Sequence, residues 1–167
     1  MTETTCPVLD IRVVPYDHGD ATLLIGELQR VYAERYGVHD VSPTDPAEFR
    51  APQGLFAVAY DASGAPVATG GWRMLAQGRA EVRRMYVRAS ARGQGHARRV
   101  LGWLEQTART AGCSRMVLET GTPQPEAIAL YRSSGYTAID PFGYYADDPK
   151  SVFLGKQLAA VGAAEGR

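Results

Sequence analysis

The sequence has few cysteines, no long apolar run and no excess of charge of either sign, and each shortage disfavours a class of protein. Its 167 residues include two cysteines, too few for the disulfide framework of a small secreted domain. No apolar stretch approaches the roughly 20 residues that a membrane-spanning helix needs. Basic and acidic residues number 18 each. The balance disfavours a general nucleic-acid binder, which usually carries a basic excess.

The motifs of several enzyme classes are missing as well. His18, His39 and His96 are not grouped with cysteines, and neither C-x-x-C nor H-x-x-x-H occurs, so no metal site is expected. No G-K-S/T triplet marks a Walker loop. Ser133 and Ser134 lack a nearby His–Asp pattern, which disfavours a serine hydrolase. The N-terminal residues MTETTCPVLD do not resemble a secretory signal, so a cytoplasmic protein without membrane or nucleic-acid partners is predicted.

The most informative stretch runs from residue 87 to residue 111 and reads VRASARGQGHARRVLGWLEQTARTA. Gly93 and Gly95 lack a Cβ, so the backbone there can turn tightly and approach a ligand closely. Apolar residues then recur at spacings of three and four, which predicts an amphipathic helix. The unpaired N–H groups and partial positive charge at its start favour an anion such as a phosphate or pyrophosphate. An ordinary glycine turn before a surface helix is the alternative interpretation.

The remaining periodicities predict one α/β domain over residues 9–159, with flexible tails at 1–8 and 160–167. Asp20 is the expected N-cap of a helix that ends near residue 36, and 97–111 and 123–133 are further helices. The successive strands 55–60, 66–74 and 80–87 should form an antiparallel meander. The order of strand, helix and strand over 80–120 implies a right-handed crossover and a parallel pair. We therefore expect a mixed, mostly antiparallel central sheet flanked by helices, with further strands at 11–14, 136–139 and 151–158.

The loop and its surroundings resemble one known family. Arg92, Gly95 and Ala97 fit the pattern Q/R-x-x-G-x-G/A, which is similar to the pyrophosphate loop of the GCN5-related N-acetyltransferase (GNAT) superfamily. The segments AEVRRMYV, RMVLET and AIALYRSSGY surround this loop in the family's order, so the resemblance covers residues 10–158. It implies the GNAT, or acyl-CoA N-acyltransferase, fold. It also implies an enzyme that uses acetyl-CoA as co-substrate and no metal.

The resemblance also implies which residues hold acetyl-CoA. Arg98, one turn into the helix, is expected either to add charge to the phosphates or to remain solvated. Gln124 stands where the family often has an asparagine that contacts the cofactor. The backbone at Met85, Tyr86 and Val87 should pair with the pantetheine arm like an added strand. The phosphates are expected on the loop, which comprises Arg92, Gly93, Gln94, Gly95, His96 and Ala97.

Two residues are candidates for the chemistry that the resemblance implies. Tyr131 lies in LYRSSGY, similar to a family signature, and a phenol there can donate a proton to the departing thiolate. The alternative for Tyr131 is a ring that only packs on the inner face of its helix. Glu81 is the candidate base, and strand alternation predicts that it faces the same side as Met85 and Val87. The alternatives are a surface carboxylate at a strand end, and a base provided by ordered water or another residue.

The acceptor is left open by the sequence. Residues 39–54 contain three prolines, and the resemblance implies that this region forms part of the acceptor site. Asp40, Asp45 and Glu48 could attract a cationic amine, but a solvated loop is the favoured interpretation. The expected reaction is direct acetylation of a small-molecule or peptide amine in a ternary complex, by a protein that could form a homodimer. Transfer of another acyl group and a CoA-binding module without turnover are the alternatives.

Overall fold

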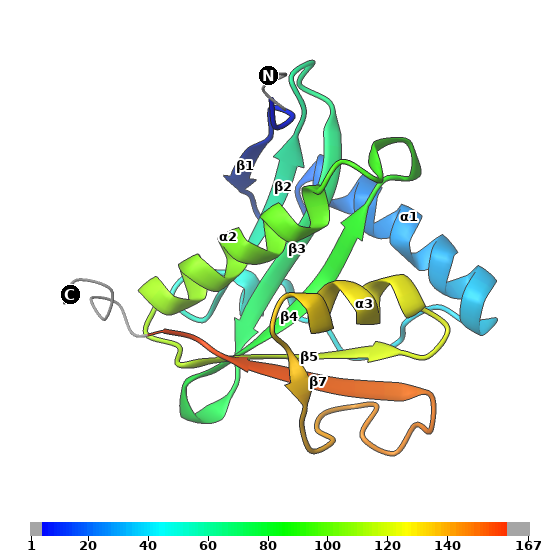
Figure 1. The fold of residues 1–167 in the computed structure, drawn as a ribbon, viewed down its shortest axis with the longest axis vertical. Coiled ribbons are helices and arrows are strands. Elements are labelled where there is room, and N and C mark those ends of the chain that lie inside the picture. Colours follow the sequence, from blue (N-terminus) through cyan, green and yellow to red (C-terminus); the bar gives the residue numbers. More distant parts are fainter. Residues whose placement is uncertain (1–4, 160–167) are drawn as a thin grey trace.

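In the computed structural model, which describes residues 5–159, the sequence forms a mixed sheet with helices on both faces (Figure 1). Antiparallel pairing dominates the sheet, in the order β1-β2-β3-β4-β5-β7-β6. The expected fold class is therefore confirmed. The strands are β1 (Asp10–Val13), β2 (Gly54–Tyr60), β3 (Pro66–Met74), β4 (Arg79–Val87), β5 (Arg115–Gly121), β6 (Thr137–Ala138) and β7 (Ser151–Gln157). The helices are α1 (Gly19–Tyr36), α2 (His96–Thr110) and α3 (Pro125–Ser133).

The sheet opens between β4 and β5, the parallel pair expected from the strand–helix–strand order. Pairing joins only Arg79–Glu81 of β4 to Arg115–Val117 of β5. Beyond these residues the two strands diverge, as Figure 1 shows, and β4 continues to Val87 paired with β3 alone. The later half of β4 therefore has a backbone edge that no described strand covers. An extended ligand could pair with this edge.

The helices pack on opposite faces of the sheet and divide the core into two clusters. The apolar stripe of α2 is buried as its periodicity predicted, with Val100 and Leu104 packed near Val82 of β4. On the other face, Leu24 of α1 packs in a second cluster that includes Phe56 of β2. Among the described residues, no helix is both long and apolar enough to span a membrane.

Most expected element boundaries agree with the structure, and the exceptions are local. The N-cap of α1 is His18, whose Nδ1 accepts a hydrogen bond from the backbone of Asp20 at 3.2 Å. Asp20 instead lies in the first turn and accepts a bond from the Tyr60 hydroxyl at 2.7 Å, so the N-cap prediction is wrong by two residues. β6 is shorter than predicted, and β7 lies between it and β5. The expected tails at 1–8 and 160–167 lie mostly outside the described residues.

A β-bulge interrupts β4. Arg83 pairs with Gly71 and Tyr86 pairs with Thr69, so β4 contains one residue more than the facing part of β3. Arg84 accommodates the extra residue with a φ of 58°, in the left-handed region that side chains other than glycine rarely adopt. Because residues of a strand alternate between its two faces, one extra residue exchanges the faces of everything that follows.

The bulge changes the expected orientation of the candidate base. Met85 and Val87 pack with Val82 in the cluster beneath α2. Glu81, which immediately precedes Val82, points to the opposite face. The prediction that Glu81 shares a face with Met85 and Val87 is therefore wrong, because it assumed an uninterrupted strand.

Candidate active site

A cavity of about 170 Å³ lies where β4 and β5 separate. Its walls come from α1, β4, β5 and α3, together with the segments 38–42 and 142–151. Both predicted catalytic residues, Glu81 and Tyr131, line it, although they are 50 positions apart in the sequence. The fold thus places a carboxylate and a phenol on one cavity, next to the uncovered edge of β4.

The Tyr131 ring packs in the core and also lines the cavity. Its side chain is only 6% exposed and its ring packs edge-on against Tyr136, with the ring centroids 5.7 Å apart. Its hydroxyl forms no hydrogen bond with any described residue, and the residue lines the cavity. Burial raises the pKa of Tyr131 well above the ordinary value of a phenol. The hydroxyl therefore stays protonated at neutral pH and has a proton to donate.

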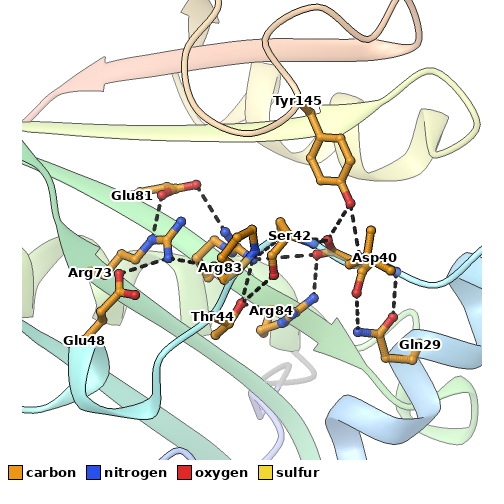
Figure 2. Close-up of polar contacts among 12 residues, drawn as sticks. Gln29, Asp40, Ser42, Thr44, Glu48, Arg73, Glu81, Arg83, Arg84 and Tyr145 are labelled. Atoms are coloured by element: carbon orange, nitrogen blue, oxygen red, sulfur yellow. Dashed lines mark hydrogen bonds and ion pairs between the residues drawn. The ribbon is translucent and has the colours of Figure 1, made fainter.

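Glu81 is buried and faces arginines. The residue is 7% exposed, so the alternative of a surface carboxylate is wrong. Arg73 Nε donates a hydrogen bond of 2.9 Å to Glu81 Oε2, and Arg83 Nη1 lies 3.7 Å from Oε1 (Figure 2). Arg73 also donates to Glu48 Oε2 at 3.0 Å. Both oxygens of Glu81 thus face guanidinium groups, a setting that holds the carboxylate in place.

Glu119 is a second carboxylate on the cavity, and the sequence reasoning missed it. It lies on β5, two residues beyond Val117, the last residue paired with β4. Ser151 Oγ donates a hydrogen bond of 2.7 Å to Glu119 Oε1, and no arginine of residues 5–159 pairs with either oxygen. Burial raises the pKa of Glu119 to about 7, although the bond from Ser151 acts in the opposite direction. An acidic residue within the otherwise apolar strand MVLET was the signal that could have identified it.

Asp40 connects three parts of the cavity wall. Its carboxylate accepts hydrogen bonds from Arg84 Nη1 at 2.6 Å, the Tyr145 hydroxyl at 2.7 Å and Ser42 Oγ at 2.7 Å (Figure 2). Gln29 of α1 bonds to the backbone N–H and carbonyl of Asp40. Burial alone would raise the pKa of Asp40, but the bonds from Ser42 and Tyr145 and the charge of Arg84 lower it below its usual value. The carboxylate ties segment 38–42 to the bulge in β4 and to segment 142–151.

These contacts revise the interpretation of the acidic residues in this region. Asp40 pairs with Arg84 and Glu48 pairs with Arg73, so neither is a freely solvated carboxylate. Asp45 is exposed and caps a short 3₁₀ helix, η1 (Pro46–Phe49), by accepting a hydrogen bond from its backbone. The expectation of a solvated loop is therefore wrong for Asp40, whereas the Glu48 side chain stays 42% exposed beside Arg73. A cationic amine would have to compete with arginines to bind them.

The glycine loop has the shape that the sequence indicated. Gly93 and Gly95 have φ values of 78° and 80°, and a Cβ at either position would meet no atom within 4 Å. No side chain caps the start of α2, so its first N–H groups remain open to an anion. His96 is 3% exposed with its Nδ1 unpartnered, and burial, followed by the charge of Arg99, lowers its pKa. The loop thus offers backbone N–H groups and open space that suit an anion.

Two other residues expected to contact the cofactor, Arg98 and Gln124, form hydrogen bonds to side chains of the protein. Arg98 donates to the hydroxyls of Ser133 at 2.8 Å and Ser134 at 3.1 Å, bridging α2 to the end of α3. Gln124 Nε2 donates to the Tyr36 hydroxyl at 2.9 Å.

The remaining residues predicted to contact acetyl-CoA differ in their solvent exposure and in the face of the sheet on which their side chains lie. Arg92 Nε donates to the carbonyl of Val87 at 3.2 Å, and Gln94 is exposed. Met85 lines the cavity, whereas the Tyr86 side chain lies on the opposite face and bonds to Glu27. Within residues 5–159, no three His, Cys, Asp or Glu side chains are placed together to hold a metal ion.

Comparison with known proteins agrees with this geometry. A sequence model of the Acetyltransferase (GNAT) family matches residues 23–136. The chain is similar to the IAA acetyltransferase of Azospirillum brasilense, with 40% identity over 136 residues, 81% of this chain and 88% of that protein. A solved structure from Klebsiella pneumoniae, named among the acyl-CoA N-acyltransferases, matches with a TM-score of 0.78 and 30% identity over 91% of this chain and 99% of that one.

The fold also matches a relative solved with its cofactor. The PaiA N-acetyltransferase of Thermoplasma acidophilum, in complex with coenzyme A, has a TM-score of 0.68 at 14% identity and covers 90% of this chain and 99% of that one. At this identity the match concerns the fold alone. The family model and the Azospirillum relative carry the assignment. The chain therefore belongs to the GNAT family of acetyltransferases.

Proposed function

We propose that this protein transfers the acetyl group of acetyl-CoA directly to a primary amine while both substrates are bound. The observation that carries the proposal is that Tyr131 and Glu119 line one cavity, and that among the described residues the phenol has no hydrogen-bond partner and the carboxylate has no arginine partner. The cavity lies at the separation of β4 and β5, near the glycine loop that suits an anion. Transfer to an amine needs a proton acceptor for the amine and a proton donor for the thiolate.

Acetyl-CoA supplies the activated acetyl thioester, and two parts of the chain would hold it. The backbone of loop 92–97 and the open start of α2 would bind its phosphates. The uncovered edge of β4, from Met85 to Val87, would bind the pantetheine arm by main-chain hydrogen bonds. A backbone carbonyl or N–H on this edge would also orient the thioester. Gly93 and Gly95 leave room for close approach, because a side chain at either position would enter that space.

Glu119 is assigned the role of proton acceptor. A base works best when its pKa lies near the working pH, and burial brings Glu119 to about 7. Glu81, the base expected from the sequence, has both oxygens facing Arg73 and Arg83. A proton on Glu81 would have to displace those contacts. Glu81 is therefore assigned to positioning Arg73 and Arg83, and it stays the alternative base.

Tyr131 is assigned the role of hydrogen-bond donor to the leaving thiolate. The amine nitrogen forms the new C–N bond as the C–S bond of the thioester breaks. The proton released by the amine passes to Glu119, and the Tyr131 hydroxyl donates a hydrogen bond to the sulfur as negative charge develops on it. The thiolate takes up a proton as CoA leaves, and Glu119 returns its proton to solvent. The raised pKa of Tyr131 keeps the phenol protonated for this role, and because a thiolate is a weaker base than this phenolate, the hydroxyl supports the leaving group without losing its proton outright.

The test is release of the CoA thiol with a panel of primary amines, paired with mass spectrometry of the acetylated product. We expect acetyl-dependent thiol release that requires an amine and falls in Tyr131→Phe and Glu119→Gln. Propionyl-CoA in a parallel arm measures acyl preference. A wild-type protein that binds acetyl-CoA but releases no thiol with any amine would contradict the proposal and favour a binding module.

A further inference from the structure

The aromatic residues of the cavity wall indicate which class of amine the cavity can accept. Resting on the proposed function, we infer that the acceptor is an arylalkylamine, meaning a primary amine on a flat aromatic group that carries no second charge. Two independent features carry the inference, namely the rings that line the acceptor side and the pairing of the charged side chains around them.

The rings come from two segments that are far apart in the sequence. Tyr32 and Tyr36 of α1 form an edge-to-face pair with centroids 6.0 Å apart. Tyr144 and Tyr145 of the segment between β6 and β7 form another pair at 4.9 Å, and Phe142 lines the cavity beside them. Aromatic walls favour an aromatic ligand, because rings gain from stacked and edge-on contacts beyond the burial of apolar area.

The hydroxyls of two of these tyrosines are fixed by the protein. The Tyr145 hydroxyl donates to Asp40, as Figure 2 shows, and the Tyr36 hydroxyl accepts from Gln124. Because these hydroxyls are held by hydrogen bonds within the protein, the two side chains can offer ring surface to a ligand. Tyr144 is different, since it lines the cavity while 62% of its surface is exposed. A large ring held open at a cavity is suited to stack on a ligand.

The arginines of the wall are already engaged. Arg84 pairs with Asp40 at 2.6 Å, and Arg73 bonds to Glu81 at 2.9 Å. Arg83 donates to the hydroxyls of Ser42 and Thr44, at 2.7 and 3.2 Å. A carboxylate or phosphate on the acceptor would therefore have to break an internal contact to find a partner.

A second ammonium group is equally unsupported. Asp40 and Glu81 are occupied by arginines, which leaves Glu119 for the reacting amine itself. Of the other charged lining residues, Asp148 and Lys150 are exposed, separated in the chain by one residue and opposite in sign, so together they present no net charge. Burying a further charge of either sign without a partner is costly. The wall thus selects against amino acids and polyamines and in favour of a neutral aromatic group.

The test compares acceptor binding, independent of turnover, by calorimetry on the wild-type protein saturated with CoA. Phenethylamine is compared with phenylalanine, which adds a carboxylate, with spermidine, which adds charge, and with butylamine, which lacks the ring. We expect phenethylamine to bind on the order of tenfold tighter than each of the others. Tighter binding of spermidine or phenylalanine, or equal binding of butylamine, would overturn the inference.

Matched variants locate the effect on the ring. Tyr144→Ala should weaken phenethylamine binding about fivefold to tenfold and leave butylamine unchanged. Leu23→Ala removes an exposed apolar side chain of α1 that does not line the cavity, and it should change neither. Loss of phenethylamine binding in Leu23→Ala alone would refute the placement.

Thiol release with the same four amines separates this inference from the proposed function. If phenethylamine binds in the expected order but no amine releases thiol, the proposed function fails and the acceptor class stands. If spermidine or phenylalanine is acetylated with the highest kcat/KM, the acceptor class is wrong and the proposed function stands.

Discussion

Replacement of Glu119 by glutamine removes one ionisable group and keeps the shape of the side chain. The amide oxygen can still accept the hydrogen bond from Ser151, so the local geometry should persist. If Glu119 is the base, kcat/KM should fall on the order of 10²-fold or more. The charged groups that act on Glu119 are Asp40 and Glu81, which raise its pKa, and Arg83, which lowers it.

The same substitution has a calculable effect on stability. Burial raises the pKa of Glu119 from 4.5 to about 7, so between these values the folded protein binds a proton that the unfolded chain does not. Stability therefore falls as pH rises from about 4.5 to about 7, and the loss is complete above 7. The gap corresponds to about 3 kcal/mol, which is an upper value because solvent reaches part of the side chain. Glu119→Gln lacks this loss, so it should be more stable than wild type at pH 8, and the difference should shrink towards pH 5.

Two assays check these expectations. Denaturant unfolding of both proteins at pH 5 and pH 8 measures the difference in the free energy of unfolding. The pH profile of kcat/KM should show a limb near pH 7 in wild type that is absent from Glu119→Gln. Ionisation of the amine substrate adds a limb to the pH profile of both proteins. The test is therefore the difference between the kcat/KM profiles of wild type and Glu119→Gln.

Glu81→Gln is the matched control for this experiment. It should not remove the limb near pH 7, since Glu81 is assigned to holding Arg73 and Arg83. Equal stability of wild type and Glu119→Gln at both pH values, together with loss of activity only in Glu81→Gln, would refute the assignment of the base.

Three further predictions concern the loop, the acid and the wall of the cavity. Gly95→Asp should abolish CoA binding in calorimetry, and Gly95→Ala should weaken it less, because alanine shares the strain of a side chain at φ 80° but adds no charge. Equal CoA affinities of wild type and Gly95→Asp would refute the loop assignment. Tyr131→Phe should lower kcat and kcat/KM together by about 10- to 10³-fold with acetyl-CoA affinity unchanged, and normal turnover would leave Tyr131 a packing residue. Arg84→Met removes the 2.6 Å partner of the buried Asp40 carboxylate and leaves Arg83 at 3.7 Å as its only cationic neighbour among the described residues, so it should lower the free energy of unfolding by about 3 kcal/mol. Arg12→Met in an exposed pair should cost less than about 1 kcal/mol, and equal losses in denaturant unfolding would contradict this.

The features that the sequence determined by itself are those set by short-range chemistry. The period of α2, the glycines before it and the turns between β2, β3 and β4 each depend on a few neighbouring residues. The strand–helix–strand order then requires the parallel step, because right-handed crossovers are strongly preferred. Tyr131 was singled out in the same way, from a signature contiguous over residues 130–136, and the structure places it on the cavity while its catalytic role stays a prediction.

The tertiary structure decided which carboxylates line the cavity, which of them pair with arginines, and which has a raised pKa. Alternation along β4 predicted that Glu81 shares a face with Met85 and Val87, which the bulge at Arg84 prevents. A contact with Asp40, 44 residues away in the sequence, stabilises this bulge, so the local sequence did not reveal it. The apolar neighbours of Glu119 in MVLET indicate that its strand is buried, but they do not indicate the pKa of its carboxyl group. Its raised pKa comes from burial among α1, β4 and the segment before β7, and desolvation depends on everything that surrounds a group in space. Sequence periodicity does not show which distant residues surround a side chain, so only the tertiary structure identifies this carboxylate as a candidate base.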